Sequence, residues 1–182
     1  MRKQVFFIFA AILYCTQSQA GLSMLAKPYL QNMQPTEVTI AWTSTGSTNA
    51  HGWVEYGTSA IDRQAFEEKD GLVMAYTNIY RVRLTNLQPN TTYQYKVICR
   101  IAEWATNSSI SFGEQIESEV YTFTTPTGNE SAFKCLVYSG VRNHTEKFAS
   151  LLSTNNLNVT DYAFVILGGD NLLGVTSESQ VN

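Results

Sequence analysis

Asp170 is the most prominent candidate for chemistry, because it follows the pair Gly168-Gly169 directly after an apolar segment. Glycine has no side chain, so a neighbouring carboxylate can approach a ligand closely. A carboxylate oxygen is a hard donor that can bridge two divalent cations. The same residue type also caps the first turn of a helix. A metal ligand and a helix cap therefore both remain open for Asp170 from the local pattern alone.

The two histidines add no second ligand to Asp170. His51 lies beside Gly52 in a region without a cluster of acids, bases or metal ligands. One imidazole without partners cannot make a metal site, so we interpret His51 as a solvated residue at a strand end. His144 lies where a helix is predicted to begin.

Three predicted elements position Asp170. Apolar strands are predicted over Ser131–Tyr138 and Asp161–Leu167, and an amphipathic helix over Thr145–Leu152. A strand, helix and strand of this length predict a right-handed parallel crossover with buried strands. Both strands end in small, polar residues, at 139–143 and 168–171. Loops at such strand ends converge, so we expect a shared crevice there.

The preceding region, from Ala26 to Thr125, is typical of an antiparallel two-sheet sandwich, with short alternating runs between turn residues. In the run Leu87–Val97 (LQPNTTYQYKV), Tyr93 is placed to fold its hydroxyl back onto the upstream backbone. The predicted strands are Thr36–Thr43, His51–Tyr56, Tyr80–Leu84 and Val120–Phe123.

The run Leu-x-Pro-x-Thr-x-Tyr that ends at Tyr93 resembles the fibronectin type III family. Within that group, Lys27–Trp42 (KPYLQNMQPTEVTIAW) and Trp53–Thr58 (WVEYGT) resemble the non-catalytic N-terminal domain of the purple acid phosphatases. The order of sandwich, linker and crossover ending in Gly-Asp is similar to that in the same family of calcineurin-like metallophosphoesterases. The expected fold class is mainly β: a fibronectin type III-like β-sandwich followed by an incomplete α/β (βαβ) segment.

The resemblance implies phosphomonoester hydrolysis at a binuclear centre of iron, zinc or manganese, with Asp170 as the bridging ligand. Three positions depart from the family pattern. Gly140 stands where the first strand should supply an Asp, Arg142 where many relatives carry His, and Leu173 near the position of the Tyr that colours the true purple enzymes. The remaining ligands would lie beyond Asn182. We therefore expect a truncated start of the catalytic domain that is inactive and does not bind metals tightly.

The N-terminus is typical of a secretory signal peptide over residues 1–20. Arg2 and Lys3 precede a short apolar run, and small residues lead up to a cleavage point after Ala20. A lipoprotein anchor on Cys15 is the alternative, although bulky Tyr14 precedes it. We expect a secreted, periplasmic or cell-surface protein without a transmembrane segment after cleavage. The predicted domains are the sandwich at 21–125, a linker at 126–130 and the truncated domain at 131–182.

The charge balance argues against nucleic acid as a partner, because 12 basic and 15 acidic residues give a net charge of -3. Cys99 and Cys135 remain after the leader, and we interpret them as buried free thiols rather than a disulfide.

An alternative function is a non-catalytic binding module for a glycan or a protein at the cell surface. Trp42, Trp53 and Tyr56 would then form a sugar-stacking platform, although core packing suits Trp42 better. A third possibility is a truncated product with no stable role of its own.

Overall fold

The computed structural model describes residues 21–45, 49–76, 78–106, 108–129, 132–142, 144–158 and 161–169. The predicted leader at 1–20 lies outside these ranges. No helix in the described part of the chain is long and apolar enough to cross a membrane.

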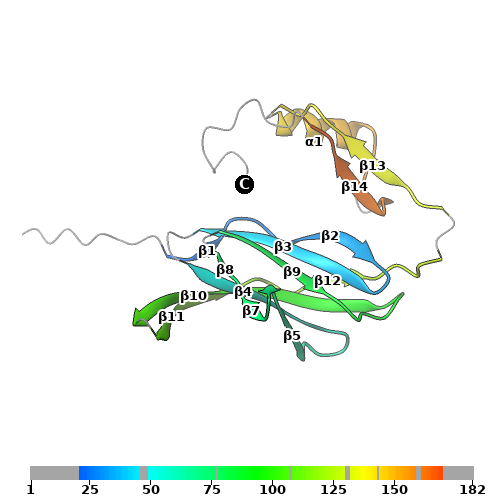
Figure 1. Cartoon of the computed structure of the whole chain (residues 1–182). Coiled ribbons are helices and arrows are strands. Elements are labelled where there is room, and N and C mark those ends of the chain that lie inside the picture. The colour runs from blue at the N-terminus through cyan, green and yellow to red at the C-terminus, as the bar shows by residue number, and fades with distance from the viewer. Residues whose placement is uncertain are drawn as a thin grey trace, which may run out of the picture.

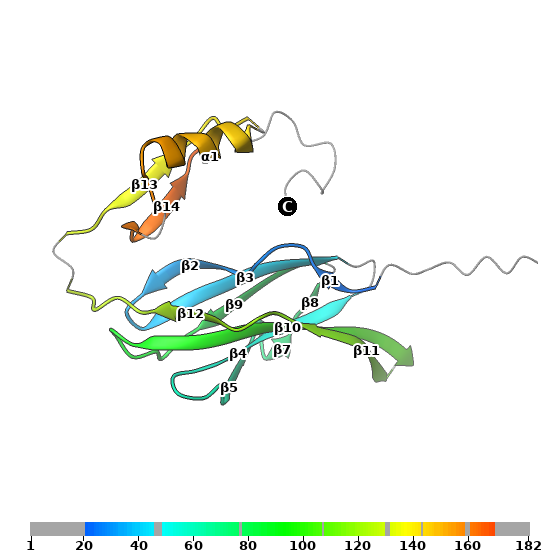
Figure 2. The ribbon, with the colours of Figure 1, turned by 180° about the vertical axis from the view of Figure 1, so that it is seen from behind.

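Two antiparallel sheets form the two layers of a sandwich, as expected for a fibronectin type III-like domain (Figures 1 and 2). In the smaller sheet, β3 is central and pairs with β2 and β9, while β1 pairs with the end of β3. Its strands are β1 (Ser23–Met24), β2 (Tyr29–Gln34), β3 (Glu37–Thr45) and β9 (Ile79–Leu84).

The larger sheet has the order β11-β10-β4-β5, with β12 also on β10 and β8 also on β4. Next to it, β6 and β7 form a separate hairpin. The strands are β4 (Ala50–Gly57), β5 (Arg63–Phe66), β6 (Glu68–Lys69), β7 (Leu72–Val73), β8 (Ala75–Tyr76), β10 (Thr92–Thr106), β11 (Ser109–Glu117) and β12 (Tyr121–Thr124). The four strands predicted for the sandwich are confirmed as β3, β4, β9 and β12, with shifts of at most two residues at their ends.

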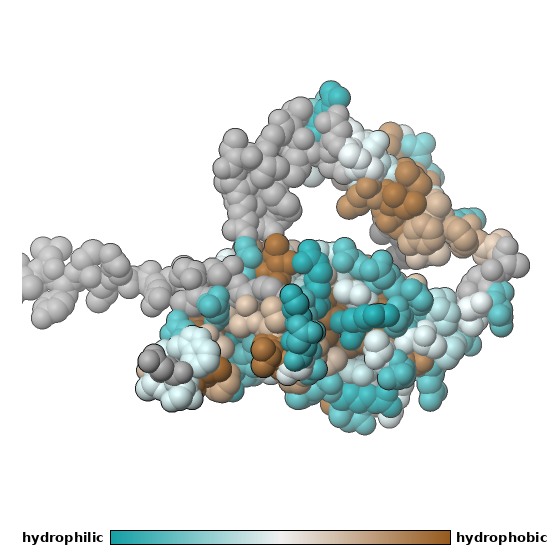
Figure 3. Space-filling view, in the orientation of Figure 1, coloured by the Kyte–Doolittle hydropathy of each residue, from teal (hydrophilic) through white to brown (hydrophobic). Residues whose placement is uncertain are grey.

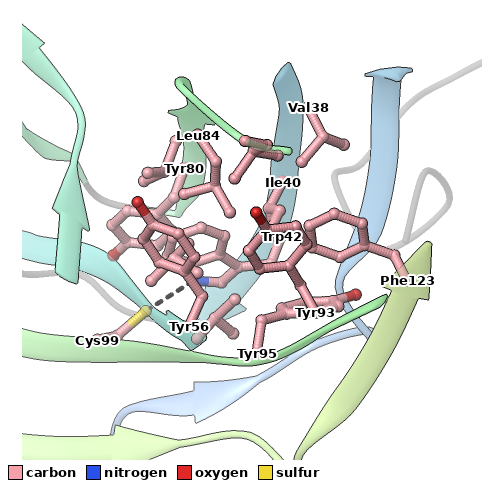
Figure 4. Packing of buried hydrophobic residues seen from close by; sticks show 14 of the residues in the cluster. Val38, Ile40, Trp42, Tyr56, Tyr80, Leu84, Tyr93, Tyr95, Cys99 and Phe123 are labelled. Atoms are coloured by element: carbon pink, nitrogen blue, oxygen red, sulfur yellow. Dashed lines mark hydrogen bonds between the residues drawn. The ribbon is translucent and has the colours of Figure 1, made fainter. Parts of the chain in front are cut away.

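The core lies between the two sheets and is rich in aromatic residues (Figure 4). Val38, Ile40 and Trp42 point inward from β3, as the alternation of that segment predicts. Trp42 stacks on Tyr80 with ring centroids 5.2 Å apart, and its Nε1 donates a hydrogen bond to Sγ of Cys99 at 3.0 Å. A buried side chain of this kind stabilises the fold by about 1.5–3 kcal/mol, so the core explains why the sandwich forms.

A parallel strand pair with a helix between its strands follows the sandwich, in the order of elements that the sequence predicts. β13 (Cys135–Tyr138) pairs with β14 (Phe164–Leu167), and α1 (Thr145–Thr154) connects them with His144 as its N-cap.

The expectation that these strands are buried is wrong for β14, because all four of its residues are exposed. On β13, Val137 is 60% exposed. Figure 3 shows the resulting apolar surface as brown atoms at the position of β13 and β14. The helix covers little of this surface, and its main ring contact is Phe148 against Tyr138, with centroids 4.2 Å apart.

Both cysteines of the described chain are free thiols, as predicted. Cys99 is buried, whereas Cys135 is only half-buried, so the prediction of two buried thiols is correct for Cys99 alone.

Candidate functional site

The ends of β13 and β14 lie side by side, as the crossover pattern predicts. The amide N–H of Gly168 donates to the carbonyl oxygen of Tyr138 at 2.7 Å, and that of Gly140 donates to Gly169 at 3.1 Å. Two backbone hydrogen bonds therefore hold the loops after the two strands together. Asp170, the predicted metal ligand, follows Gly169 but lies outside the described residues, as does Leu173.

Gly140 brings a backbone bend but no side-chain donor to this edge of the sheet. Its φ of +71° lies in the left-handed region that favours glycine. A Cβ added to Gly140 would meet no heavy atom within 4 Å, so the space for a larger side chain exists. Arg142, the second departure from the family pattern, also has a positive φ, at 49°.

The described residues contain no group of three or more His, Cys, Asp or Glu side chains that could hold a metal ion.

The outer face of the larger sheet carries a row of aromatic rings. Residues 51, 53 and 55 of β4 alternate with the core residues of that strand and therefore share this face. Ring centroids are 5.0 Å apart between His51 and Trp53, and 6.0 Å apart between Trp53 and Phe66. Nε1 of Trp53 donates to Oε1 of Glu55 at 3.2 Å.

Burial raises the pKa of Glu55, but hydrogen bonds from Trp53 and Gln64 and the nearby charge of Lys96 outweigh it and leave the pKa below its usual value. The carboxylate of Glu55 is therefore ionised where it fixes the indole.

His51 is part of this aromatic row and is not the solvated strand-end residue that the sequence suggested. Its ring lies between those of Trp53 and Phe112, the latter with centroids 5.5 Å away. Nε2 of His51 is buried and has no hydrogen-bond partner among the described residues. Burial, and then the positive charge of Arg100, hold the pKa of His51 below its usual value. His51 is therefore a neutral packing residue at neutral pH.

A hollow of about 430 Å³ lies beyond this row, where β10 and β11 leave the sandwich. Trp104 is its largest lining residue and is 73% exposed, and Ile110, opposite it on β11, is 50% exposed. Figures 1 and 2 show that this β10–β11 hairpin projects past the other strands at one end of the sandwich. We call this feature the Trp104 hollow; its lining is Asn49, Val73, Ala75, Ala102, Glu103, Trp104 and Ile110.

Residues 27–125 match the family model of the purple acid phosphatase N-terminal domain. The chain belongs to this family. The sandwich is therefore a purple acid phosphatase N-terminal domain, and the resemblance read from Lys27–Trp42 and Trp53–Thr58 is confirmed.

Solved structures with similarity to the chain include a purple acid phosphatase from seeds of yellow lupin (Lupinus luteus). It is 22% identical, the match covers 64% of this chain and 22% of the lupin chain, and the TM-score is 0.42. The chain thus spans about a fifth of the length of the lupin protein. The fibronectin type III domain of human fibronectin type III domain containing protein 3 is 25% identical over 64% of this chain and 99% of its own, with a TM-score of 0.35. No curated protein matches the chain.

The three aromatic residues considered for a sugar-stacking platform do not lie together. Trp42 and Tyr56 are part of the core, whereas Trp53 lies on the opposite face of the larger sheet and is only 8% exposed. The most exposed indole belongs to Trp104, which was not among the residues predicted to bind a sugar. The sequence could have indicated the position of Trp104. Tyr95 and Cys99 of β10 point into the core, and because side chains alternate along a strand, residue 104 falls on the opposite, outer face.

Proposed function

We propose that this chain is an exported, catalytically inactive member of the purple acid phosphatase-like metallophosphoesterases. The match of residues 27–125 to the N-terminal domain of that family carries the proposal. The parallel crossover at the position expected for the start of a metallophosphoesterase domain supports it. Complete relatives, as the resemblance implies, hydrolyse phosphomonoesters at two metal ions. Export rests on the leader-like sequence at residues 1–20.

Gly140 is the reason for proposing inactivity. The edge where β13 and β14 end is the place where the family pattern requires a carboxylate from each strand. Position 140 offers only its backbone there, and its N–H is already used by the carbonyl of Gly169. Asp170 would then be the single carboxylate at this edge. One carboxylate does not fit a centre of two metal ions, so we derive no hydrolytic step for this chain.

An assay of the purified chain on p-nitrophenyl phosphate tests the proposal. We expect no turnover above a no-protein control when iron, zinc or manganese is added. The matched variant is Gly140→Asp, which restores the second carboxylate; no atom blocks a Cβ there, and Asp is among the residues that adopt the left-handed φ of position 140 most readily.

Calorimetric titration with zinc gives a readout that does not depend on activity. We expect tighter zinc binding by Gly140→Asp than by the parent chain, and loss of this gain when Asp170→Asn is added to it. Metal-dependent turnover of the parent chain that Asp170→Asn removes would contradict the proposal.

A further inference from the structure

We propose that the Trp104 hollow is a binding site for a ring of a neutral saccharide. This site is independent of the edge formed by Gly140 and Gly169, and its role does not depend on the phosphatase lineage. Three features carry the proposal: an exposed indole on an apolar shelf, an amide at its rim, and a packed aromatic layer that keeps the shelf in place.

The shelf is formed by side chains that the register of β10 and β11 brings to one face. Trp104 pairs with Ile110, and Ala102 pairs with Phe112. Trp104 is 73% exposed, although the other two tryptophans of the chain, Trp42 and Trp53, are buried. Contiguous exposed apolar side chains mark binding surfaces, and here Ile110 and Phe112, at 50% and 53% exposure, adjoin Trp104. An indole face of this kind suits the apolar C–H face of a sugar ring.

The rim of the hollow supplies hydrogen-bonding groups. The carbonyl oxygen of Asn49 accepts the N–H of Ala102 at 3.0 Å, which ties Asn49 to the side of the shelf. Its position two residues before His51 places Asn49 on the same outer face of the sheet. An amide offers two donors and one acceptor, so it can bind neighbouring hydroxyl groups of a sugar. An apolar ring face with hydroxyls at its edge therefore matches this lining.

The shelf is supported by the aromatic row on the outer face. Phe112 lies between His51, at 5.5 Å, and the guanidinium carbon of Arg100, which is 4.6 Å from the centre of the Phe112 ring. His51 in turn stacks on Trp53. Phe112 does not line the hollow, but these contacts help to hold the β10–β11 pair that carries Trp104 and Ile110, and an ordered support favours affinity by preorganisation.

Other occupants suit the hollow less well. Its volume of about 430 Å³ is that of a small-molecule site, whereas a stable protein interface needs about 800 Å² from each partner. A phosphate or carboxylate ligand would be repelled by the carboxylate of Glu103 in the lining. The guanidinium of Arg100 would not offset this repulsion, because it lies over the ring of Phe112. A lipid chain would leave the amide of Asn49 without a partner.

Isothermal titration of the full chain with neutral and anionic oligosaccharides tests the proposal. We use cellohexaose and chitohexaose as neutral probes and an oligogalacturonate as the anionic probe. We expect saturable binding of at least one neutral probe and none of the anionic one. Trp104→Ala should weaken this binding by at least about tenfold. Asn49→Ala should also weaken it and provides a second test from the rim.

Phe133→Ala is the matched control, because Phe133 is another exposed aromatic residue, at 65%, and does not line the hollow. It should bind as the parent chain does, and circular dichroism should show that all three variants are folded. The proposal is overturned if no neutral probe binds at millimolar concentration, or if Trp104→Ala binds like the parent. It is also overturned if the Trp104→Ala change removes only self-association of the chain. The titration needs no metal, so these results leave the phosphatase proposal untouched.

Discussion

At the scale of single residues, Tyr93 closes the corner at which the chain enters β10. Its hydroxyl oxygen accepts the N–H of Gln88 at 2.9 Å, and its ring stacks on Phe123 with centroids 5.5 Å apart. Thr125 completes the corner, because its Oγ1 accepts the N–H of Thr91 at 3.0 Å and donates to the carbonyl of Gln88 at 2.6 Å. The backbone polar groups of this turn are thus satisfied by side chains rather than by water.

Tyr93→Phe should lower the free energy of unfolding by about 1–2 kcal/mol, because the partly buried N–H of Gln88 loses its acceptor while the ring stays packed. Urea unfolding followed by tryptophan fluorescence measures this. The control is Tyr29→Phe, which removes a hydroxyl from a tyrosine that is 45% exposed and should leave the midpoint unchanged. Equal midpoints for the two variants would show that the corner hydrogen bond does not stabilise the fold.

The role of the Tyr93 hydroxyl could be predicted because its hydrogen-bond partner, Gln88, lies only five residues away along the chain. The contact between Trp42 and Cys99 could not, since 57 residues separate them and only the packing of the two sheets brings them together. The same holds in part for His51. Trp53 follows two residues later on the same face of β4, but Phe112 comes from β11, so the local sequence indicates only one of the two aromatic neighbours of His51.

At the scale of elements, β14 is an apolar strand that is exposed along its whole length, whereas its partner β13 is mostly half-buried. Residues 164–167 of β14 are between 40% and 62% exposed. Their parallel pairing starts at Cys135 and Phe164, which lie four and three residues after the starts of the two predicted strands. The length of a strand depends on where its partner runs, which an apolar run cannot indicate. β11 was not predicted either: Ile110, Phe112 and Ile116 alternate with polar residues, but Glu114 interrupts the pattern, and the strand form depends on pairing with β10.

Ile166→Lys should reduce self-association of the full chain, because a charge interrupts the exposed apolar strand. Ile166 is 46% exposed, so the lysine can be hydrated without disturbing a core. Light scattering at increasing protein concentration measures the effect. Val120→Lys is the control, since Val120 is 52% exposed but lies in the sandwich. A similar reduction in both variants would mean that net charge, and not the strand pair, controls association.

At the scale of the whole molecule, every core residue in the described part of the chain belongs to the sandwich. Its buried residues lie between Leu22 and Phe123. Thr125, the last residue matched by the family model, is 1% exposed and hydrogen-bonded to the corner at Tyr93. The residues that follow, at 127–129, are exposed. The end of the sandwich domain after residue 125 stays a prediction. It can be tested with a fragment, because the core residues all lie before it.

A fragment of residues 21–129 should fold alone and unfold at the same urea concentration as the full chain. All three tryptophans of the protein, Trp42, Trp53 and Trp104, lie in this fragment, so their fluorescence reports on the sandwich in both proteins. A midpoint that falls clearly in the fragment would show that the crossover segment stabilises the sandwich and that the boundary is placed too early.

The long strand β10 has two halves with different surroundings. From Tyr93 to Cys99 its inward side chains are fixed in the core, whereas from Ala102 onward it forms a ribbon with β11 that extends past the sandwich (Figures 1 and 2). Substitutions in the ribbon change the surface that the domain presents but touch few buried atoms. The fold can therefore accept changes there at little loss of stability, so evolution or design can vary this surface while the scaffold stays the same.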